Sequence, residues 1–144
     1  HSMTAAEQAP SAWHDWPVRV YYEDTDAQGI VYFANYLRFM ERGRTEWLRA
    51  QGIGQAELSR ERQLCFSLIS TNIRFLKPAL FDDELVVRTR VTSWSGARVA
   101  FEQAVHRDAA SGEVLCSAMC EAACLDTQSL RPRRLPQDIL TELG

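Results

Sequence analysis

The amino-acid sequence predicts an α+β domain in which one long helix packs against an antiparallel sheet. Two observations support this fold class. Apolar residues recur at helical spacing between residues 34 and 51, and four apolar segments follow one another through short turns between residues 64 and 126. Consecutive strands joined by short turns pair antiparallel, so we expect the helix to cover one face of the resulting sheet.

The chain begins with a polar segment that leads into a short strand. Residues 1–17 are predicted to form an N-terminal arm, whose first two residues, before Met3, are typical of an expression remnant. Residues 18–22 alternate well enough for a strand, and residues 23–29 have the Asp, Thr and Gly content of a turn. A chain of 144 residues suits one domain, which we expect to span residues 18–144.

A long helix is predicted from residue 34 or 35 to residue 51. Its apolar residues are spaced by one, three or four positions, which places them on one face of the helix. These residues are Tyr36, Phe39, Met40, Gly43, Trp47 and Ala50. Gly52 is suited to end the helix as the residue after the C-cap. Gly43 lowers helix propensity but lies on the apolar face, so we expect close contact with something flat there.

Four strands are predicted after a polar connector, residues 53–63, that contains a helical turn. The strands cover residues 64–77, 84–94, 97–107 and 113–126. Pro78 closes the first of them, and Ser95 with Gly96 forms a tight turn between the second and the third. The last strand is rich in Ala, Cys and Ser, which allows a helix to approach it closely.

Composition and charge exclude several classes of protein. The chain has 46% hydrophobic and 24% charged residues, which argues against intrinsic disorder. Its net charge of −3 disfavours nucleic acid as a partner. No apolar run approaches the roughly 20 residues that span a bilayer, and the first residues do not have the pattern of a secretory signal. We therefore expect neither an integral membrane segment nor secretion.

The four cysteines, Cys65, Cys116, Cys120 and Cys124, are interpreted as small apolar residues of the core. The last three are four residues apart, about 13 Å per step on a strand, which is too far for one metal ion to bind two of them. No histidine lies near them in the sequence. We predict no metal and no cofactor, and a cytoplasmic location because nothing requires disulfides.

Three motifs resemble a known family of enzymes. The motifs are YEDTDAQGIVYFANYL at residues 22–37, MERGRTEWLR at residues 40–49 and FLKPA at residues 75–79. The first is similar to the signature of the 4-hydroxybenzoyl-CoA-type thioesterases, and the other two resemble its YbgC-like branch, associated with the Tol-Pal system of Gram-negative bacteria. The resemblance covers residues 18–126. It implies the hotdog fold, a long helix wrapped by a curved antiparallel sheet, and hydrolysis of acyl-CoA thioesters.

The resemblance also implies two catalytic groups. The family's active-site aspartate corresponds to Asp26, and its oxyanion donor corresponds to the main-chain N–H of Phe33, where His or Tyr is more usual. A helix N-terminus carries free N–H groups and partial positive charge, which suits an oxyanion. Gly29 allows the turn to fold the carboxylate back toward the helix. Asp26 is expected to attack the thioester directly or to activate water, and the sequence leaves both routes open.

Further residues are candidates for substrate binding. Gly29 and Tyr32 belong to the same motif, while Lys77 and Arg131 suit the phosphates of CoA or are plain surface charges. Nearby carboxylates have simpler interpretations. Asp24 and Glu23 are expected to shape the turn or to pair with arginines. Glu41 either forms an exposed ion pair with an arginine on its own helix or points into a cleft shared between subunits. The ion pair is the favoured interpretation.

We expect the substrate to be a thioester of CoA or of acyl carrier protein, bound between the subunits of a homodimer or homotetramer. Two other functions fit the same sequence. A hydratase or dehydratase of this fold typically uses a histidine, but neither His14 nor His106 lies at the helix start. A non-catalytic acyl-binding or protein-interaction module of the cell envelope is the other alternative, because Phe33 departs from the family pattern.

Overall fold

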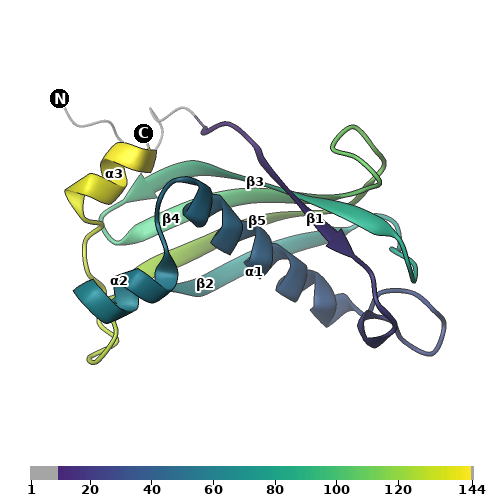
Figure 1. Cartoon of the computed structure of the whole chain (residues 1–144), viewed down its shortest axis with the longest axis horizontal. Coiled ribbons are helices and arrows are strands. Elements are labelled where there is room, and N and C mark those ends of the chain that lie inside the picture. Colours follow the sequence, from purple (N-terminus) through teal and green to yellow (C-terminus); the bar gives the residue numbers. More distant parts are fainter. Residues whose placement is uncertain (1–9, 144) are drawn as a thin grey trace.

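The computed structural model describes residues 10–143, and it contains a five-stranded antiparallel sheet wrapped around one long helix (Figure 1). The strands are β1 (His14–Arg19), β2 (Leu64–Phe75), β3 (Glu84–Ser95), β4 (Arg98–Arg107) and β5 (Val114–Asp126). The helices are α1 (Phe33–Ala50), α2 (Gln55–Arg62) and α3 (Gln137–Leu143), and the 3-10 turn η2 (Tyr22–Asp24) precedes α1. The predicted α+β class is confirmed.

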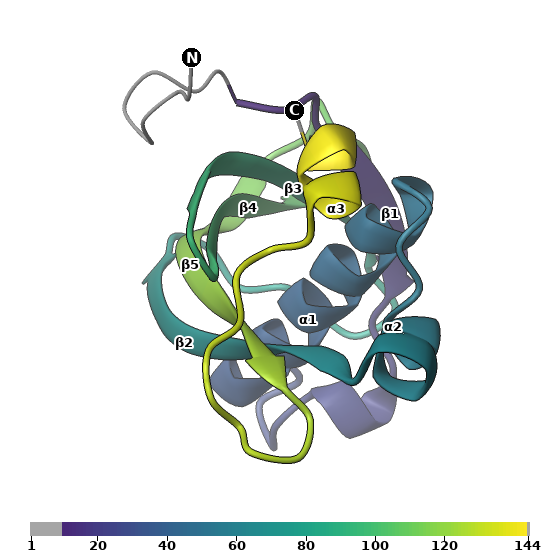
Figure 2. The ribbon, with the colours of Figure 1, turned by 90° about the vertical axis from the view of Figure 1, so that its left-hand side faces the viewer.

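The strands lie in the order β1-β3-β4-β5-β2, and each neighbouring pair is antiparallel. Strands β1 and β2 are therefore the two edges of the sheet. The sheet curves around α1, which lies along its concave side (Figure 2). The core fills the space between them and is made of Phe39, Met40 and Trp47 from α1 and alternate residues of β3, β4 and β5.

Helix α1 matches its prediction within one or two residues at each end. It buries the predicted apolar face, apart from Ala50, which is exposed. Gly52 has a φ of +83°, its N–H donates to the carbonyl of Arg49, and the N–H of Ile53 donates to the carbonyl of Leu48. This is the Schellman arrangement, in which a residue of left-handed conformation satisfies the last carbonyls of a helix.

A buried glutamine ties α1 to the sheet. Gln103 of β4 is 0% exposed, and its Nε2 donates to the carbonyl of Met40 and to Oγ1 of Thr89, both at 2.9 Å. Its Oε1 accepts a hydrogen bond from Nη1 of Arg44 at 3.0 Å. A buried amide that lost these partners would carry a desolvation cost of about 1–3 kcal/mol, so the network fixes how α1 sits on the sheet.

The first strand begins earlier than predicted. Strand β1 covers His14–Arg19 rather than residues 18–22, so residues 14–17 of the predicted arm belong to the sheet. Pro17 obscured this strand in the sequence because proline lacks the N–H of a sheet ladder. An edge strand tolerates it, and β1 is an edge strand. Residues 1–9 of the predicted arm lie outside the described residues.

The described end of the arm also contacts the sheet. The ring of Trp13 lies over two guanidinium groups, with Arg88 at 4.8 Å and Arg90 at 4.3 Å from the ring centroid. Ser11 extends the pairing, because its N–H donates to the carbonyl of Val91 and its Oγ accepts from the Val91 N–H. An aromatic ring over a cation is a favourable contact, so it holds the arm against β3.

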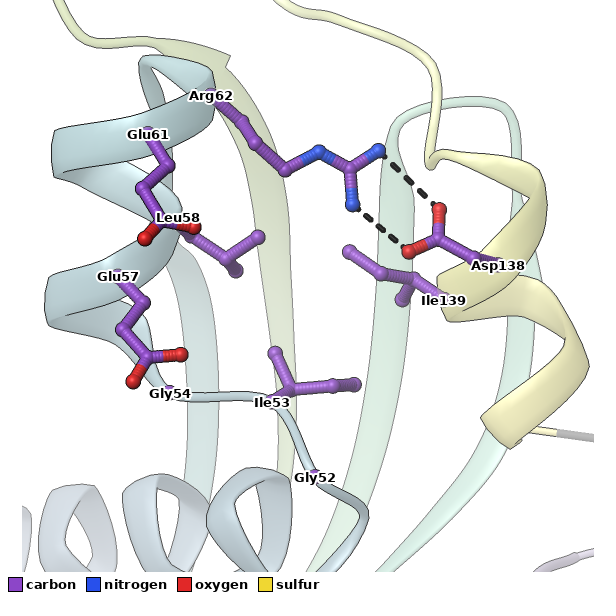
Figure 3. Close-up of a pocket in the computed structure, with 9 residues that line it drawn as sticks. All are labelled: Gly52, Ile53, Gly54, Glu57, Leu58, Glu61, Arg62, Asp138 and Ile139. Carbon is purple, nitrogen blue, oxygen red and sulfur yellow. Dashed lines mark hydrogen bonds and ion pairs between the residues drawn. The ribbon is translucent and has the colours of Figure 1, made fainter.

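Two short helices pack together at the end of the molecule opposite the start of α1 (Figure 1). Leu58 of α2 and Ile139 of α3 are buried, and Arg62 donates two hydrogen bonds to Asp138, at 2.8 and 3.1 Å (Figure 3). The sequence predicted one helical turn in residues 53–63 and no helix in the tail. Both helices depend on contacts between distant segments rather than on a periodic apolar pattern of their own.

We predict that Gly43→Ala destabilises the protein although alanine favours helix. A Cβ at this position would lie 2.7 Å from Cγ1 of Val87 and 2.8 Å from Oγ1 of Thr89. Overpacking costs about 1–3 kcal/mol and the gain in propensity is about 1 kcal/mol, so the net loss should be on the order of 1 kcal/mol. Urea unfolding measures this change. The loss should shrink when Val87→Ala makes room, and equal losses in both backgrounds would contradict the steric explanation.

Candidate active site

A small hairpin carries the chain from η2 to the start of α1. The N–H of Tyr32 donates to the carbonyl of Asp24 at 3.0 Å, and the N–H of Asp26 donates to the carbonyl of Ile30 at 2.9 Å. An isolated antiparallel bridge between Thr25 and Val31 lies between these two bonds. The hairpin therefore holds Asp26 in one short segment with the first residues of α1.

Gly29 closes the tip of this hairpin. Its φ is +80°, a value that favours glycine, and its N–H donates to the carbonyl of Asp26 at 3.0 Å. The carbonyl of Gly29 accepts a hydrogen bond from the N–H of Phe81 at 3.4 Å. The predicted role of Gly29 in folding the turn back is confirmed, whereas its predicted contact with substrate stays a prediction.

Asp24 anchors the hairpin to the helix. It is buried, its Oδ2 accepts a hydrogen bond from the N–H of Tyr21 at 2.9 Å, and its Oδ1 accepts one from Nδ2 of Asn35 at 3.0 Å. Asn35 lies in the first turn of α1. The expected role of Asp24 in shaping the turn is confirmed, and the sequence did not indicate that this carboxylate also reaches the helix.

Asp26 differs from Asp24 in being exposed. Its Oδ1 accepts a hydrogen bond from the N–H of Gln28 at 2.8 Å, which is an Asx turn within the hairpin. Its other carboxylate oxygen accepts no hydrogen bond from the part of the chain that the structure describes. Asp26 therefore keeps one oxygen available to a ligand or to water while the other is fixed by its own loop.

The start of α1 has main-chain donors available. Tyr32 is the N-cap, and its side chain makes no capping hydrogen bond. The N–H of Asn35 donates to the carbonyl of Tyr32 at 2.9 Å, but in residues 10–143 no acceptor receives the N–H of Phe33. The first N–H groups of a helix have no partner within it and lie at the positive end of its dipole, so they favour an anionic oxygen.

An apolar pocket of about 260 Å³ opens beside this helix end. It is lined by Ile30, Val31, Phe33, Tyr36, Phe75, Leu76, Lys77 and Pro78. The ring of Phe75 lies 4.8 Å from that of Phe33 and 5.5 Å from that of Tyr36, measured between centroids. The walls therefore suit an apolar group, and Lys77 supplies the one cationic side chain of the lining.

Tyr36 is held in place at the base of this pocket. Its hydroxyl oxygen accepts a hydrogen bond from the N–H of Ala79 at 3.1 Å, and its side chain is buried. Burial raises the pKa of Tyr36, although the hydrogen bond from Ala79 lowers it in part. The phenol therefore stays neutral at physiological pH and serves as wall and hydrogen-bonding group rather than as a base.

The structure brings together some predicted site residues and separates others. Phe33 and Lys77 line the same pocket, with Tyr32 at the preceding N-cap. Lys77 forms a 3.4 Å ion pair with Glu113 on the surface. Arg131 lies in the segment after β5, where its carbonyl accepts the N–H of Asp126, and Asp126 pairs with Leu64 at the opposite end of β2 from Phe75. Arg131 is thus not near this pocket within one subunit.

The sequence analysis predicted only Phe33 and Lys77 among the residues that line this pocket, and the missed ones include two aromatic residues, Tyr36 and Phe75. Tyr36 follows Phe33 by three residues, a helical spacing that signals a shared face, but it was assigned only to the core. Phe75 was assigned to a strand without a role. Its contact with the helix arises because β2 runs antiparallel to α1 and ends beside its start, which depends on the tertiary fold.

Three of the four cysteines are core residues as predicted, whereas Cys65 is only partly buried. Cys116, Cys120 and Cys124 are buried, and all four cysteines are free thiols. Burial raises the pKa of Cys116 to about 12, and the neighbouring Cys120 contributes to the rise, so this thiol is not a nucleophile at neutral pH.

Among the described residues, no helix is long and apolar enough to cross a membrane.

Comparison with known proteins identifies relatives over nearly the whole chain. A family model described as "Thioesterase-like superfamily" matches residues 20–143. The chain is 41% identical over 127 residues to the acyl-CoA thioester hydrolase YbgC of Escherichia coli, covering 88% of this chain and 92% of the relative. It is 42% identical over 124 residues to the acyl-CoA thioesterase YbgC of Haemophilus influenzae, covering 86% and 89%.

Solved structures of thioesterases also superpose on this chain. A probable thioesterase from Bartonella henselae superposes with a TM-score of 0.80 at 38% identity, covering 87% of this chain and 100% of that one. The 4-hydroxybenzoyl-CoA thioesterase from Pseudomonas superposes with a TM-score of 0.83 at 22% identity, covering 92% and 99%. The second likeness concerns the fold alone.

We predict that Asp24→Ala lowers the free energy of unfolding by about 1–3 kcal/mol, because the substitution leaves the buried side-chain amide of Asn35 and the partly buried N–H of Tyr21 without their acceptor. Chemical denaturation measures the change. Glu23→Ala is the matched control, since Glu23 is an exposed neighbour, and it should change stability by no more than about 0.5 kcal/mol. Similar losses in the two variants would show that the buried bonds of Asp24 contribute nothing particular.

Proposed function

Because the chain belongs to the thioesterase-like superfamily and has its hotdog fold, we propose that it hydrolyses acyl-CoA thioesters to a free acid and CoA. One observation carries the proposal. A single hairpin holds an exposed carboxylate, Asp26, and leads into an uncapped helix start beside an apolar pocket. These are the groups that acyl transfer needs: a nucleophile or base, an oxyanion donor and a place for the acyl group.

In the proposed mechanism the thioester oxygen faces the N–H of Phe33. As the carbonyl carbon becomes tetrahedral, negative charge develops on this oxygen, and the main-chain N–H with the helix dipole stabilises it. The role falls on the main chain, so the phenylalanine side chain in place of the family's usual His or Tyr does not remove it. The ring contributes instead to the apolar wall of the acyl pocket.

Asp26 acts on the carbonyl carbon by one of two routes. As a nucleophile, its free carboxylate oxygen bonds to the carbon, the C–S bond breaks, CoA leaves as the thiolate, and water then hydrolyses the mixed anhydride. As a general base, it accepts a proton from water while the hydroxide attacks and the thiolate leaves. A single turnover in ¹⁸O-labelled water tests the nucleophilic route. When water attacks the Asp26 carbonyl of the anhydride, the first molecule of acid carries an unlabelled oxygen from Asp26 and the label enters Asp26, which the general-base route cannot produce.

Lys77 is proposed to hold the acyl carrier. It stands on the pocket rim with an exposed ammonium group, which suits a CoA phosphate or the phosphate of an acyl carrier protein's prosthetic arm. Gly29 and Tyr32 are proposed to border the thioester through their main chain. The compartment proposed is the cytoplasm, in keeping with four free thiols.

A homodimer is proposed to complete the site. Edge strand β2 presents Leu68, Ile69 and Phe75 at 41%, 45% and 45% exposure, and Leu37 of α1 is also 41% exposed. An unprotected apolar edge favours pairing with a second copy, whereas the other edge, β1, is short and contains Pro17. A dimer of such dimers is compatible with the same edge.

Such a dimer would also bring Arg131 of one subunit near the acyl pocket of the other. Two-fold pairing of β2 with its copy sets the start of one strand beside the end of the other. Leu64 at the start of β2 pairs with Asp126, whose N–H donates to the carbonyl of Arg131. Arg131 therefore approaches the acyl pocket only from the partner subunit, and its proposed contact with CoA belongs to that arrangement.

We predict that Asp26→Asn lowers kcat on the best acyl-CoA by about 10²- to 10⁴-fold, because the amide retains the shape but loses nucleophilicity and basicity. Release of thiol from a panel of acyl-CoAs measures the rate. Glu23→Gln is the control, since it removes the same charge from an exposed residue of the same turn. Asp24 is unsuitable as a control because it holds the helix start. Near-normal turnover in Asp26→Asn would move the catalytic role elsewhere.

We predict that Ile69→Lys shifts the protein from dimer, or dimer of dimers, toward monomer, because a charge on an edge strand opposes pairing. Sedimentation measures the mass, and thioesterase activity should fall with dissociation. Leu130→Lys, on a loop residue that is 64% exposed, should leave both unchanged. A fully active monomeric wild type would contradict a site shared between subunits.

A further inference from the structure

Arg44 is a half-buried cation on the side of α1 that faces β5. Its Nη1 donates to Oε1 of Gln103 at 3.0 Å and lies 3.9 Å from Sγ of Cys120. Gln103 is itself fixed by Met40 and Thr89, so the guanidinium is held in a defined position. Its remaining N–H groups donate to no described residue.

No described carboxylate forms an ion pair with Arg44. Burial lowers the pKa of Arg44, and the neighbouring Cys120 and Glu41 offset this only in part. The carboxylate of Glu41 instead accepts a hydrogen bond from Oγ1 of Thr45 at 3.3 Å. Burying a charge without a partner is costly, and proteins that keep such a group usually supply it with an anion.

Arg44 lines a pocket that has room for such an anion. The pocket measures about 130 Å³ and is distinct from the apolar pocket at the start of α1. It is lined by Glu41, Arg44, Thr45, Leu48, Gln55, Phe66, Leu68, Phe101 and Ala122. Five of these nine residues are apolar, and the polar ones are Glu41, Arg44 and Thr45 of α1 and Gln55 of α2. Arg44 is the only cation among them.

The two pockets lie along the same helix and the same strand. Tyr36 and Phe75 line the first, and Arg44 and Leu68 line the second. At 1.5 Å per residue, α1 rises about 16 Å from Phe33 to Arg44. Leu37 follows Phe33 by four residues and precedes Arg44 by seven, spacings that put the three on one face of α1, and its side chain is exposed. It offers an apolar contact to an acyl chain that extends from Phe33 toward Arg44.

We propose that Arg44 binds a carboxylate at the far end of the acyl group, which makes ω-carboxyacyl thioesters preferred substrates of this protein. The inference rests on the proposed function and adds a specificity-determining residue to it. A guanidinium forms two parallel hydrogen bonds to a carboxylate, and these distinguish a charged chain end from a methyl group. Glu41 at the same pocket opposes a second negative charge, which weakens the preference without abolishing it.

The experiment compares pairs of substrates of equal chain length. The pairs are adipoyl- and hexanoyl-CoA, suberoyl- and octanoyl-CoA, sebacoyl- and decanoyl-CoA, and dodecanedioyl- and lauroyl-CoA. The measured quantity is the ratio of kcat/KM for the carboxylated substrate to that for its partner. We expect this ratio to peak at one chain length, and Arg44→Met to lower it there by roughly tenfold to a hundredfold.

Three further variants separate selectivity from folding. Arg44→Lys keeps the charge but loses the paired hydrogen bonds, so its ratio should lie between those of the wild type and Arg44→Met. Glu41→Gln removes the opposing charge and should raise the ratio. Arg38→Met removes an exposed cation of the same helix and should leave the ratio unchanged. Circular dichroism establishes that each variant is folded, and Arg44→Lys replaces Arg44→Met where the latter is not.

A ratio that does not change between the wild type and the Arg44 variants at any length would overturn the inference, even where both substrates are hydrolysed. A wild type that hydrolyses neither substrate of any pair would overturn the proposed function instead. In that case the affinities of the protein for sebacate and for decanoate, measured by calorimetry, test the carboxylate site at Arg44 independently of hydrolysis. Tighter binding of sebacate that is lost in Arg44→Met supports the carboxylate site, and equal binding of the two acids excludes it.

Discussion

The position of α1 on the sheet is the constraint on which the rest of the molecule depends. Gly43 lets the helix approach β3 so closely that a Cβ would lie 2.7 Å from Cγ1 of Val87. Gln103 of β4 connects helix and sheet through its hydrogen bond to the carbonyl of Met40. Fixed in this way, α1 presents its uncapped start to the end of β2 and its Arg44 to β5. A rotation of α1 would move its start and Arg44 together, so the shapes of the two pockets depend on the same helix position.

Much of the fold could be predicted because its patterns are local. The helical spacing of Tyr36, Phe39 and Trp47 fixed α1 within two residues, and Gly96 marked the hairpin between β3 and β4. The motif around Asp26 indicated a turn that leads into a helix, and the hydrogen bonds of that hairpin bear this out. In each case one stretch of sequence carries enough information to specify its own conformation.

The remainder could not be predicted because it depends on distant partners. Strand β1 contains Pro17, which argues against a strand until its place at an edge is known. Helix α3 exists through Ile139 and the bond of Asp138 to Arg62, a residue far away in the sequence. Phe75 becomes a pocket wall only when β2 returns along α1. Arg131 suited CoA by charge, but charge alone carries no information on which end of the sheet it occupies.

The shared helix bears on how such a protein selects substrates. Apolar walls distinguish chain lengths weakly, since one methylene is worth about 1–3 kcal/mol in a hydrophobic pocket. The proposed carboxylate site at the half-buried Arg44 adds a stronger criterion, because only a chain whose carboxylate reaches Arg44 recovers the cost of leaving water. The proposed oxyanion donor at Phe33 and the proposed carboxylate-binding guanidinium of Arg44 would then contact opposite ends of the substrate. On this reasoning α1 sets both where the reaction occurs and which acyl group is in register for it.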